Sequence, residues 1–138
     1  MAWEWPVLGT LGVAGMIDAI YVLRLTLKPA PVRLVEEEAC SIADPAACQT
    51  LFHTPNAALL GRIPNSALGL VFYLLLIVSA ITPVPRWWVV LLSMAATAAL
   101  GMSIWLFVSL RRRRIVCVPC FIGHGINLVL FLILLRLL

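Results

Sequence analysis

The sequence predicts an all-α membrane protein, a four-transmembrane-helix bundle with a large loop between its first two helices. The first observation is the composition, because 63% of the 138 residues are hydrophobic and 12% are charged, whereas a water-soluble domain has about 45 to 50% apolar and about 25% charged residues. The second is the charge spacing, since uncharged stretches of 23, 24 and 21 residues follow Arg62, Arg86 and Arg114. Each stretch exceeds the roughly 20 residues of helix that cross a bilayer.

The predicted helices cover residues 6–27, 66–82, 87–110 and 115–137 of one domain, residues 1–138. The first helix is interrupted between residues 5 and 23 by a single charge, Asp18. It is expected to remain in the mature protein, because it opens with Trp-Glu-Trp instead of the basic segment that begins a signal peptide. The last three helices are joined by short turns, one of them proline-rich and the other the block Arg111–Arg114.

The net charge of +4 does not indicate nucleic-acid binding. Only ten basic residues are present, and four of them form the Arg111–Arg114 block beside a predicted helix end. Basic residues in such a position flank membrane spans. The lipid bilayer is therefore an expected partner, and a nucleic acid is not.

Residues 28–65 form the largest connection and carry most of the polar chemistry of the chain, including two of its four cysteines. Within this loop Asp44 and Pro45 are the residue types typical of an N-cap and of the first helical position. The sequence therefore predicts a short helix after them. Cys48 is expected near the positive end of that helix, where a thiolate is favoured.

All four cysteines are predicted to lie at one membrane face. Helices that alternate in direction bring the large loop and the arginine turn together. Cys40 and Cys48 belong to the loop, and Cys117 and Cys120 open the last helix. Cysteines that only fill a core are common, but such residues would be scattered through the helices.

Two thiol pairs at one face can bind a metal or exchange electrons. A four-cysteine zinc site is disfavoured, because Cys40 and Cys48 are widely spaced and a closed site would bury its charge against lipid. We therefore predict no metal. Cys117 and Cys120 have the C-x-x-C spacing of thiol oxidoreductases, and a second pair in the facing loop suits a relay in which one disulfide exchanges with another.

One face of the last helix carries Cys117, Cys120, His124 and Asn127, because these residues are spaced at i, i+3, i+7 and i+10. A thiol at the mouth of a bundle, with polar side chains beneath it, indicates a pocket for a small molecule. The alternative is that His124 and Asn127 form hydrogen bonds that hold the helices together.

The chain resembles the vitamin K epoxide reductase family over nearly its whole length. The resemblance depends on the four-helix layout, the loop cysteines, Phe52 and Thr54 after them, the segment 64–73 that opens the second helix, and the Cys117-Val-Pro-Cys120 motif. It implies an enzyme, a thiol:quinone oxidoreductase that forms disulfide bonds at the expense of a membrane quinone of the ubiquinone or menaquinone type. All four cysteines would be catalytic.

The resemblance also implies roles for individual residues. Cys40 would exchange with a reduced thioredoxin-like partner, and Cys48 would pass electrons to Cys117 through a transient disulfide, which leaves Cys120 facing the quinone. Asn65 would hydrogen-bond a quinone carbonyl. The remaining residues expected to steady the loop or to line the quinone pocket are Phe52, Thr54, Phe72, Tyr73 and His124.

Two departures from the family pattern change these expectations. His124 stands where vertebrate members have a tyrosine, so reduction of vitamin K epoxide is not expected. A thioredoxin-like domain, which is fused to some bacterial members, does not follow the last helix. We therefore expect a separate partner protein and a multi-pass protein of a prokaryotic plasma membrane.

Two other functions fit part of the pattern. A DsbB-type quinone oxidase also has four helices, but it carries its C-x-x-C pair in the first large loop, the reverse of this chain. A non-catalytic membrane subunit with a structural disulfide gains support from Asp18, since an acid within a span marks an ion path or a buried partner. A hydrogen bond that packs two helices together is the simpler explanation of Asp18.

The basic residues also predict an orientation. Eight of the ten lie at or near the cysteine face, whereas Arg86 and Arg136 lie at the other. The positive-inside rule therefore places the cysteine face in the cytoplasm, opposite to the usual orientation of the family. Such a protein would suit an organism with disulfide-rich intracellular proteins, as in hyperthermophiles.

Overall fold

The chain forms four helices and a short hairpin in the part that the computed structural model describes, which is residues 3–27, 58–59, 63–114 and 117–138. The helices are α1 (Glu4–Leu27), α3 (Asn65–Ile81), α4 (Arg86–Arg113) and α5 (Val118–Leu137). Strands β1 (Ala58–Leu59) and β2 (Ile63–Pro64) pair antiparallel directly before α3. These residues confirm the helical prediction, and the hairpin is a feature that the sequence did not indicate.

Three of these helices, α1, α4 and α5, are long and apolar enough to cross a membrane. Helix α3 has 17 residues, which corresponds to about 25 Å at 1.5 Å per residue, somewhat less than the roughly 30 Å of hydrocarbon in a bilayer. The chain is therefore an integral membrane protein. The short helix predicted inside the large loop lies outside the described residues.

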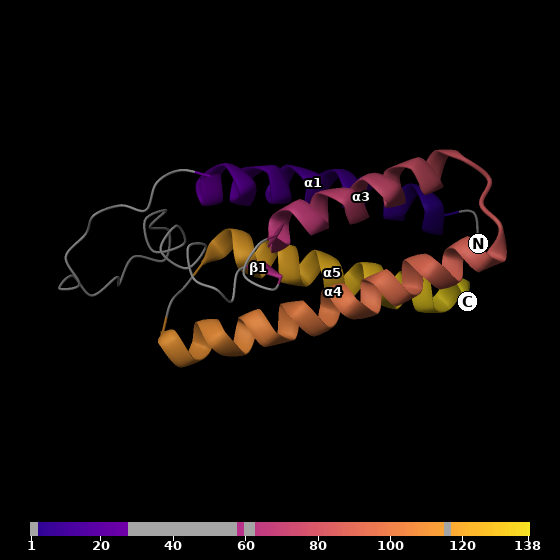
Figure 1. The fold of residues 1–138 in the computed structure, drawn as a ribbon. Coiled ribbons are helices and arrows are strands. Elements are labelled where there is room, and N and C mark those ends of the chain that lie inside the picture. Colours follow the sequence, from indigo (N-terminus) through magenta and orange to yellow (C-terminus); the bar gives the residue numbers. More distant parts are fainter. Residues whose placement is uncertain (1–2, 28–57, 60–62, 115–116) are drawn as a thin grey trace.

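The helices alternate in direction along the bundle (Figure 1). Helix α1 packs mainly on α3, α4 packs on α5, and α1 also contacts α5. Both chain termini and the α3–α4 turn lie at one end of the bundle, whereas the last residues of α1 and α4 and the first residues of α5 lie at the other. Cys117 and Cys120 are therefore at the end where α1 and α4 finish.

Small residues let α1 approach α3 closely. A Cβ atom added to Gly15 would lie 2.5 Å from Cε1 of the Tyr73 ring, and one added to Gly12 would lie 3.3 Å from the Tyr73 carbonyl oxygen. Membrane helices associate through small residues of this kind, because lipid provides no hydrophobic drive for helix pairing. The close approach holds the Tyr73 ring against α1.

The core follows the axis of the bundle, and the outer faces are apolar as well. Buried side chains from all four helices form it, among them Leu8, Phe72, Tyr73, Leu76, Leu92, Ala96, Leu130 and Leu134. On the outside, large apolar side chains such as Ile17, Val71 and Trp105 are more than half exposed. An apolar surface of this extent is suited to contact with lipid.

The connection between α4 and α5 differs from the predicted arginine turn. Helix α4 continues beyond Leu110 to Arg113, and Arg114 closes it in the left-handed conformation, with φ of 55° and its N–H donating to the Arg111 carbonyl at 3.2 Å. Arginine is a good helix former, and its charge is favourable at the negative end of a helix. Helix α5 begins at Val118 with Cys117 as its N-cap residue, so the thiol pair spans the start of this helix.

Candidate functional site

A cavity of about 180 Å³ lies between the four helices, at the end of the bundle that carries the C-x-x-C pair. Every described helix contributes to its wall, with polar positions at Asp18, Asn65, Ser66, Ser103, Cys120 and His124. The rest of the wall is largely apolar. A mostly apolar hollow with a few polar groups is the usual form of a small-molecule site.

The C-x-x-C pair stands at the edge of this cavity. The Sγ atom of Cys120 lies 2.7 Å from the Sγ atom of Cys117, compared with about 2.05 Å for two sulfurs joined in a disulfide. Cys117 is fully buried, whereas Cys120 is half-buried and lines the cavity. Pro119 lies in the first turn of α5, where a helix tolerates proline. The two sulfurs can therefore join with a small movement, and Cys120 is the one that borders the cavity.

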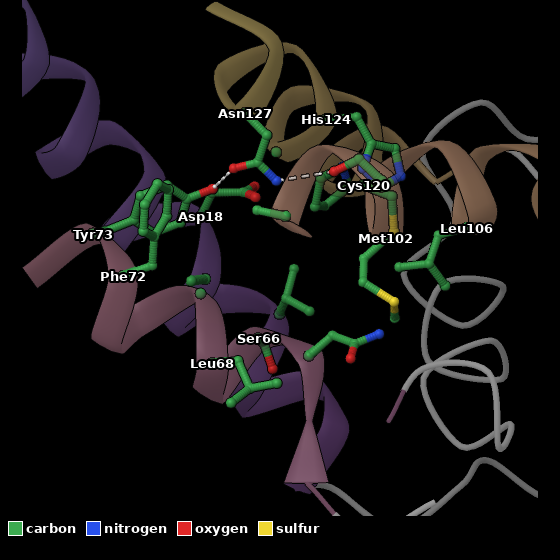
Figure 2. Close-up of a pocket in the computed structure, with 18 of the residues that line it drawn as sticks. Asp18, Ser66, Leu68, Phe72, Tyr73, Met102, Leu106, Cys120, His124 and Asn127 are labelled. Atoms are coloured by element: carbon green, nitrogen blue, oxygen red, sulfur yellow. Dashed lines mark hydrogen bonds between the residues drawn. The ribbon is translucent and has the colours of Figure 1, made fainter. Parts of the chain in front are cut away.

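A chain of hydrogen bonds joins three helices deeper in the bundle. The Tyr73 hydroxyl donates to Oδ1 of Asn127 at 2.8 Å, and Nδ2 of Asn127 donates to Oγ of Ser103 at 2.9 Å. Figure 2 shows Tyr73 and Asn127 meeting across the cavity from α3 and α5. For Asn127, the structure thus supports the interpretation that it holds helices together.

His124 differs from Asn127 in this respect. It lines the cavity one turn below Cys120, and Figure 2 shows the two side chains next to each other on α5. Its Nε2 atom is buried and has no hydrogen-bond partner among the described residues. An unsatisfied buried polar atom costs about 1 to 3 kcal/mol, so a ligand in the cavity that pairs with this nitrogen would be stabilised.

The structure brings together most of the predicted site residues that it describes. This cavity is lined by Asn65, Phe72, Tyr73, Cys120 and His124. Phe72 also contacts the Tyr73 ring, with centroids 5.7 Å apart. The other predicted site residues, Cys40, Cys48, Phe52 and Thr54, lie outside the described part of the chain.

Three polar residues of the wall were missed by the sequence reasoning, and they are Thr26, Ser66 and Ser103. Ser66 follows Asn65 directly, and its Oγ atom is buried without a partner among the described residues. Ser103 is buried in the middle of α4 and accepts the hydrogen bond from Asn127. Its neighbours Ala99, Met102 and Leu106 line the same cavity at helical spacing, but apolar residues surround α4 on all sides, so no periodic signal marked this face.

The fold and the site together define a class, a helical membrane protein with a redox-capable thiol pair at the edge of a small internal cavity. The model of the vitamin K epoxide reductase family matches residues 6–135. Because this match covers nearly the whole chain, the protein belongs to the vitamin K epoxide reductase family. Members of this family are oxidoreductases, and the match supports a membrane redox activity for this chain. A comparison with curated proteins finds no match.

Proposed function

We propose that this protein is a quinone-dependent thiol oxidase that forms disulfide bonds in a thioredoxin-like partner. The observation that carries the proposal is the position of Cys120, which contacts Cys117 on one side and borders the cavity on the other. A thiol pair that is oxidised needs an electron acceptor within contact distance. The cavity beside Cys120 is where such an acceptor would bind.

The size and lining of the cavity fit the head group of a quinone. Its volume of about 180 Å³ exceeds that of an engineered cavity of about 150 Å³ that binds benzene, so one substituted ring can be accommodated. The buried Nε2 atom of His124 would donate a hydrogen bond to a ring carbonyl in its N–H tautomer, and the Asn65 amide is a second candidate donor. A quinone bound here would accept two electrons and two protons from the thiol pair.

The side chains of the cavity would divide the remaining tasks. Cys120 would contact the acceptor, and Cys117 would close the disulfide with it, since their sulfurs are already 2.7 Å apart. Phe72 and Leu110 supply apolar wall that limits the entry of water. Tyr73 is held by its hydrogen bond to Asn127 and would form one fixed side of the pocket.

Electrons would reach this pair from the loop cysteines by thiol–disulfide exchange. A Cys40–Cys48 disulfide would take two electrons from the dithiol of the partner, so that the partner leaves oxidised and both loop cysteines become thiols. The Cys48 thiolate would then attack the Cys117–Cys120 disulfide at Cys117 and release Cys120 as a thiolate. Attack of Cys40 on Cys48 would complete the exchange.

A cysteine-trapping experiment tests this order. In Cys40→Ala the thiol that would attack Cys48 and complete the exchange is missing, so we expect a Cys48–Cys117 disulfide to accumulate. In Cys48→Ala, the Cys117–Cys120 disulfide should remain, and the protein should no longer oxidise a partner. Mass spectrometry of non-reduced digests identifies these bonds. Absence of any bond between the two pairs in Cys40→Ala would argue against the relay.

Substitution of Cys120 separates the enzyme from a non-catalytic membrane subunit. Cys120→Ser should abolish quinone reduction by dithiol in purified protein, because the pair can no longer form its disulfide. A subunit with only a structural role should tolerate the change. Expression level and thermal stability in detergent provide the control that the variant is folded.

A further inference from the structure

Helix α1 carries an acid inside the bundle that the thiol chemistry above does not use. Asp18 lies well within this helix, which is long and apolar enough to span the membrane, and it lines the cavity. An ionisable side chain within a span is costly and therefore marks a function or a bound partner. Asp18 is therefore expected to interact with another residue of the bundle or with a molecule bound in the cavity.

Its depth is given by its neighbour on α5. A Cβ atom added to Gly123 would lie 2.9 Å from Oδ2 of Asp18, so the carboxyl packs directly against this glycine. Gly123 is one turn below Cys120 and one turn above Asn127. Asp18 therefore lies between the thiol end and the hydrogen-bonded end of the same cavity, where α1 meets α5.

The other polar groups at this depth are already paired. The Tyr73 hydroxyl donates to Asn127, and the Asn127 amide donates to Ser103. Asp18 interacts electrostatically with Tyr73, yet its carboxyl forms no hydrogen bond or ion pair with another residue in the described part of the chain. A packing role would require such a bond, so the simpler explanation of Asp18 is not supported.

Among the described residues that line the cavity with Asp18, there is no lysine or arginine that could form an ion pair with its carboxylate. Helix α3 presents Tyr73, and α5 presents Cys120 and His124, whereas the lining residues of α4 include no titratable group. Among the described residues that line the cavity, Asp18 is the one carboxylic acid, and it forms no hydrogen bond with any of the others. It is free to exchange a proton with whatever occupies the cavity.

From this geometry we propose that Asp18 is a proton-transfer residue that serves the acceptor bound in the cavity. When the Cys117 and Cys120 sulfurs join, the thiol pair loses two electrons and two protons, and the acceptor gains both. Asp18 would donate one proton to an acceptor oxygen and regain one of the protons released by the thiols, so that it is unchanged after each turnover. This inference rests on the proposed quinone-dependent oxidation.

The first test compares two acids of α1 in the full chain, purified in lipid nanodiscs, with dithiothreitol as reductant and a short-chain quinone as acceptor. In Asp18→Asn we expect kcat to fall by about a hundredfold, the lower end of the contribution of general acid–base catalysis, with KM changed less than about threefold. Glu4→Gln is the matched control, because Glu4 is also buried with an unpartnered oxygen but does not line the cavity. It should keep the wild-type kcat.

The second test moves the carboxyl without removing it. Gly123→Ala places a methyl group 2.9 Å from Asp18 Oδ2, so the flexible carboxyl must shift, whereas Gly125→Ala, on the same helix, meets no atom within 4 Å. We expect a lower kcat only in Gly123→Ala. Both variants retain Asp18, so they test whether the position of its carboxyl affects kcat even where Asp18→Asn proves unstable.

A spectroscopic measurement tests the contact itself. Adding the short-chain quinone to oxidised protein should shift a carboxyl band in the infrared difference spectrum, and this shift should vanish in Asp18→Asn and persist in Glu4→Gln. A wild-type protein that reduces no quinone would overturn the proposed function. Where the wild-type protein does reduce quinone, three results would overturn the role of Asp18 alone. These are a kcat of Asp18→Asn within twofold of the wild-type kcat, a change in KM with no change in kcat, and the absence of the Asp18 band shift.

Discussion

At the scale of single residues, the proposed function assigns Asn65 and His124 as hydrogen-bond donors to a ring in the cavity. They reach it from different helices, since Asn65 begins α3 and His124 lies in α5. A ring held from two sides has a defined orientation relative to Cys120. The prediction for Asn65 follows from this arrangement.

Asn65→Ala should slow quinone-dependent turnover by about tenfold to a hundredfold. The reason is the loss of one hydrogen bond in a site shielded from water, which costs about 1 to 3 kcal/mol. The measurement is steady-state quinone reduction, with exchange between the protein and a small disulfide measured in parallel. Exchange should be nearly unchanged, because it needs only the cysteines.

Thr97→Ala serves as the control, since the Thr97 hydroxyl donates to the Ser93 carbonyl within α4 and Thr97 does not line the cavity. This variant should retain both rates. Equal losses of quinone reduction and thiol exchange in Asn65→Ala would instead identify Asn65 as a structural residue.

At the scale of helices, the pairing of α1 with α3 decides where the Tyr73 ring lies. Gly15 leaves space for that ring, and the ring in turn presents its hydroxyl to Asn127 of α5. The contact between two helices thereby positions a side chain toward a third. A change at Gly15 should therefore affect both stability and the cavity.

We expect Gly15→Ala to destabilise the protein by about 1 to 3 kcal/mol, the usual cost of overpacking a close interface. The added methyl carbon would lie 2.5 Å from the Tyr73 ring, so the ring or the helix must move. Gly101→Ala is the matched control, because a Cβ atom there meets nothing within 4 Å. Thermal unfolding of both variants in the same detergent measures the difference, and equal stabilities would contradict a close α1–α3 contact at Gly15.

At the scale of the whole molecule, the distribution of charge between the two ends of the bundle predicts which end faces the cytoplasm. The exposed block Arg111–Arg114 ends α4 at the cysteine end, whereas Arg86 begins α4 and Arg136 lies near the end of α5, at the other. The block supplies half of the eight basic residues counted at the cysteine face. It therefore carries the main weight of the cytoplasmic assignment.

Expression in a bacterium that lacks its own periplasmic thiol oxidase measures this orientation. The wild-type chain should fail to oxidise periplasmic proteins, because its cysteine face is expected in the cytoplasm. Neutralising Arg111–Arg114 and adding lysines near Arg86 should invert the bundle and restore periplasmic oxidation. Replacing the four arginines by lysine keeps the charge and should not invert it. Efficient periplasmic oxidation by the unmodified chain would contradict the assignment while leaving the enzyme proposal intact.

The sequence by itself determined the membrane class, the four long helices of the described residues and the end of the bundle at which Cys117 and Cys120 lie. These properties depend on local composition, on charge spacing and on the alternation of short connections, all of which can be read along the chain. Even so, Arg111 was expected to leave the helix and instead continues it, because exposed arginines are favourable in a last helical turn.

Only the tertiary structure decided which side chains meet across the bundle. In a water-soluble helix, a polar outer face indicates which side points inward, but here lipid makes the outer face as apolar as the core, so Ser103 and its neighbours on α4 gave no such signal. The rotation of each helix is decided instead by close contacts such as that of Gly15 with Tyr73. That is why Asp18, a lone charge when read along the chain, could be recognised as part of the cavity wall only after the helices were packed together.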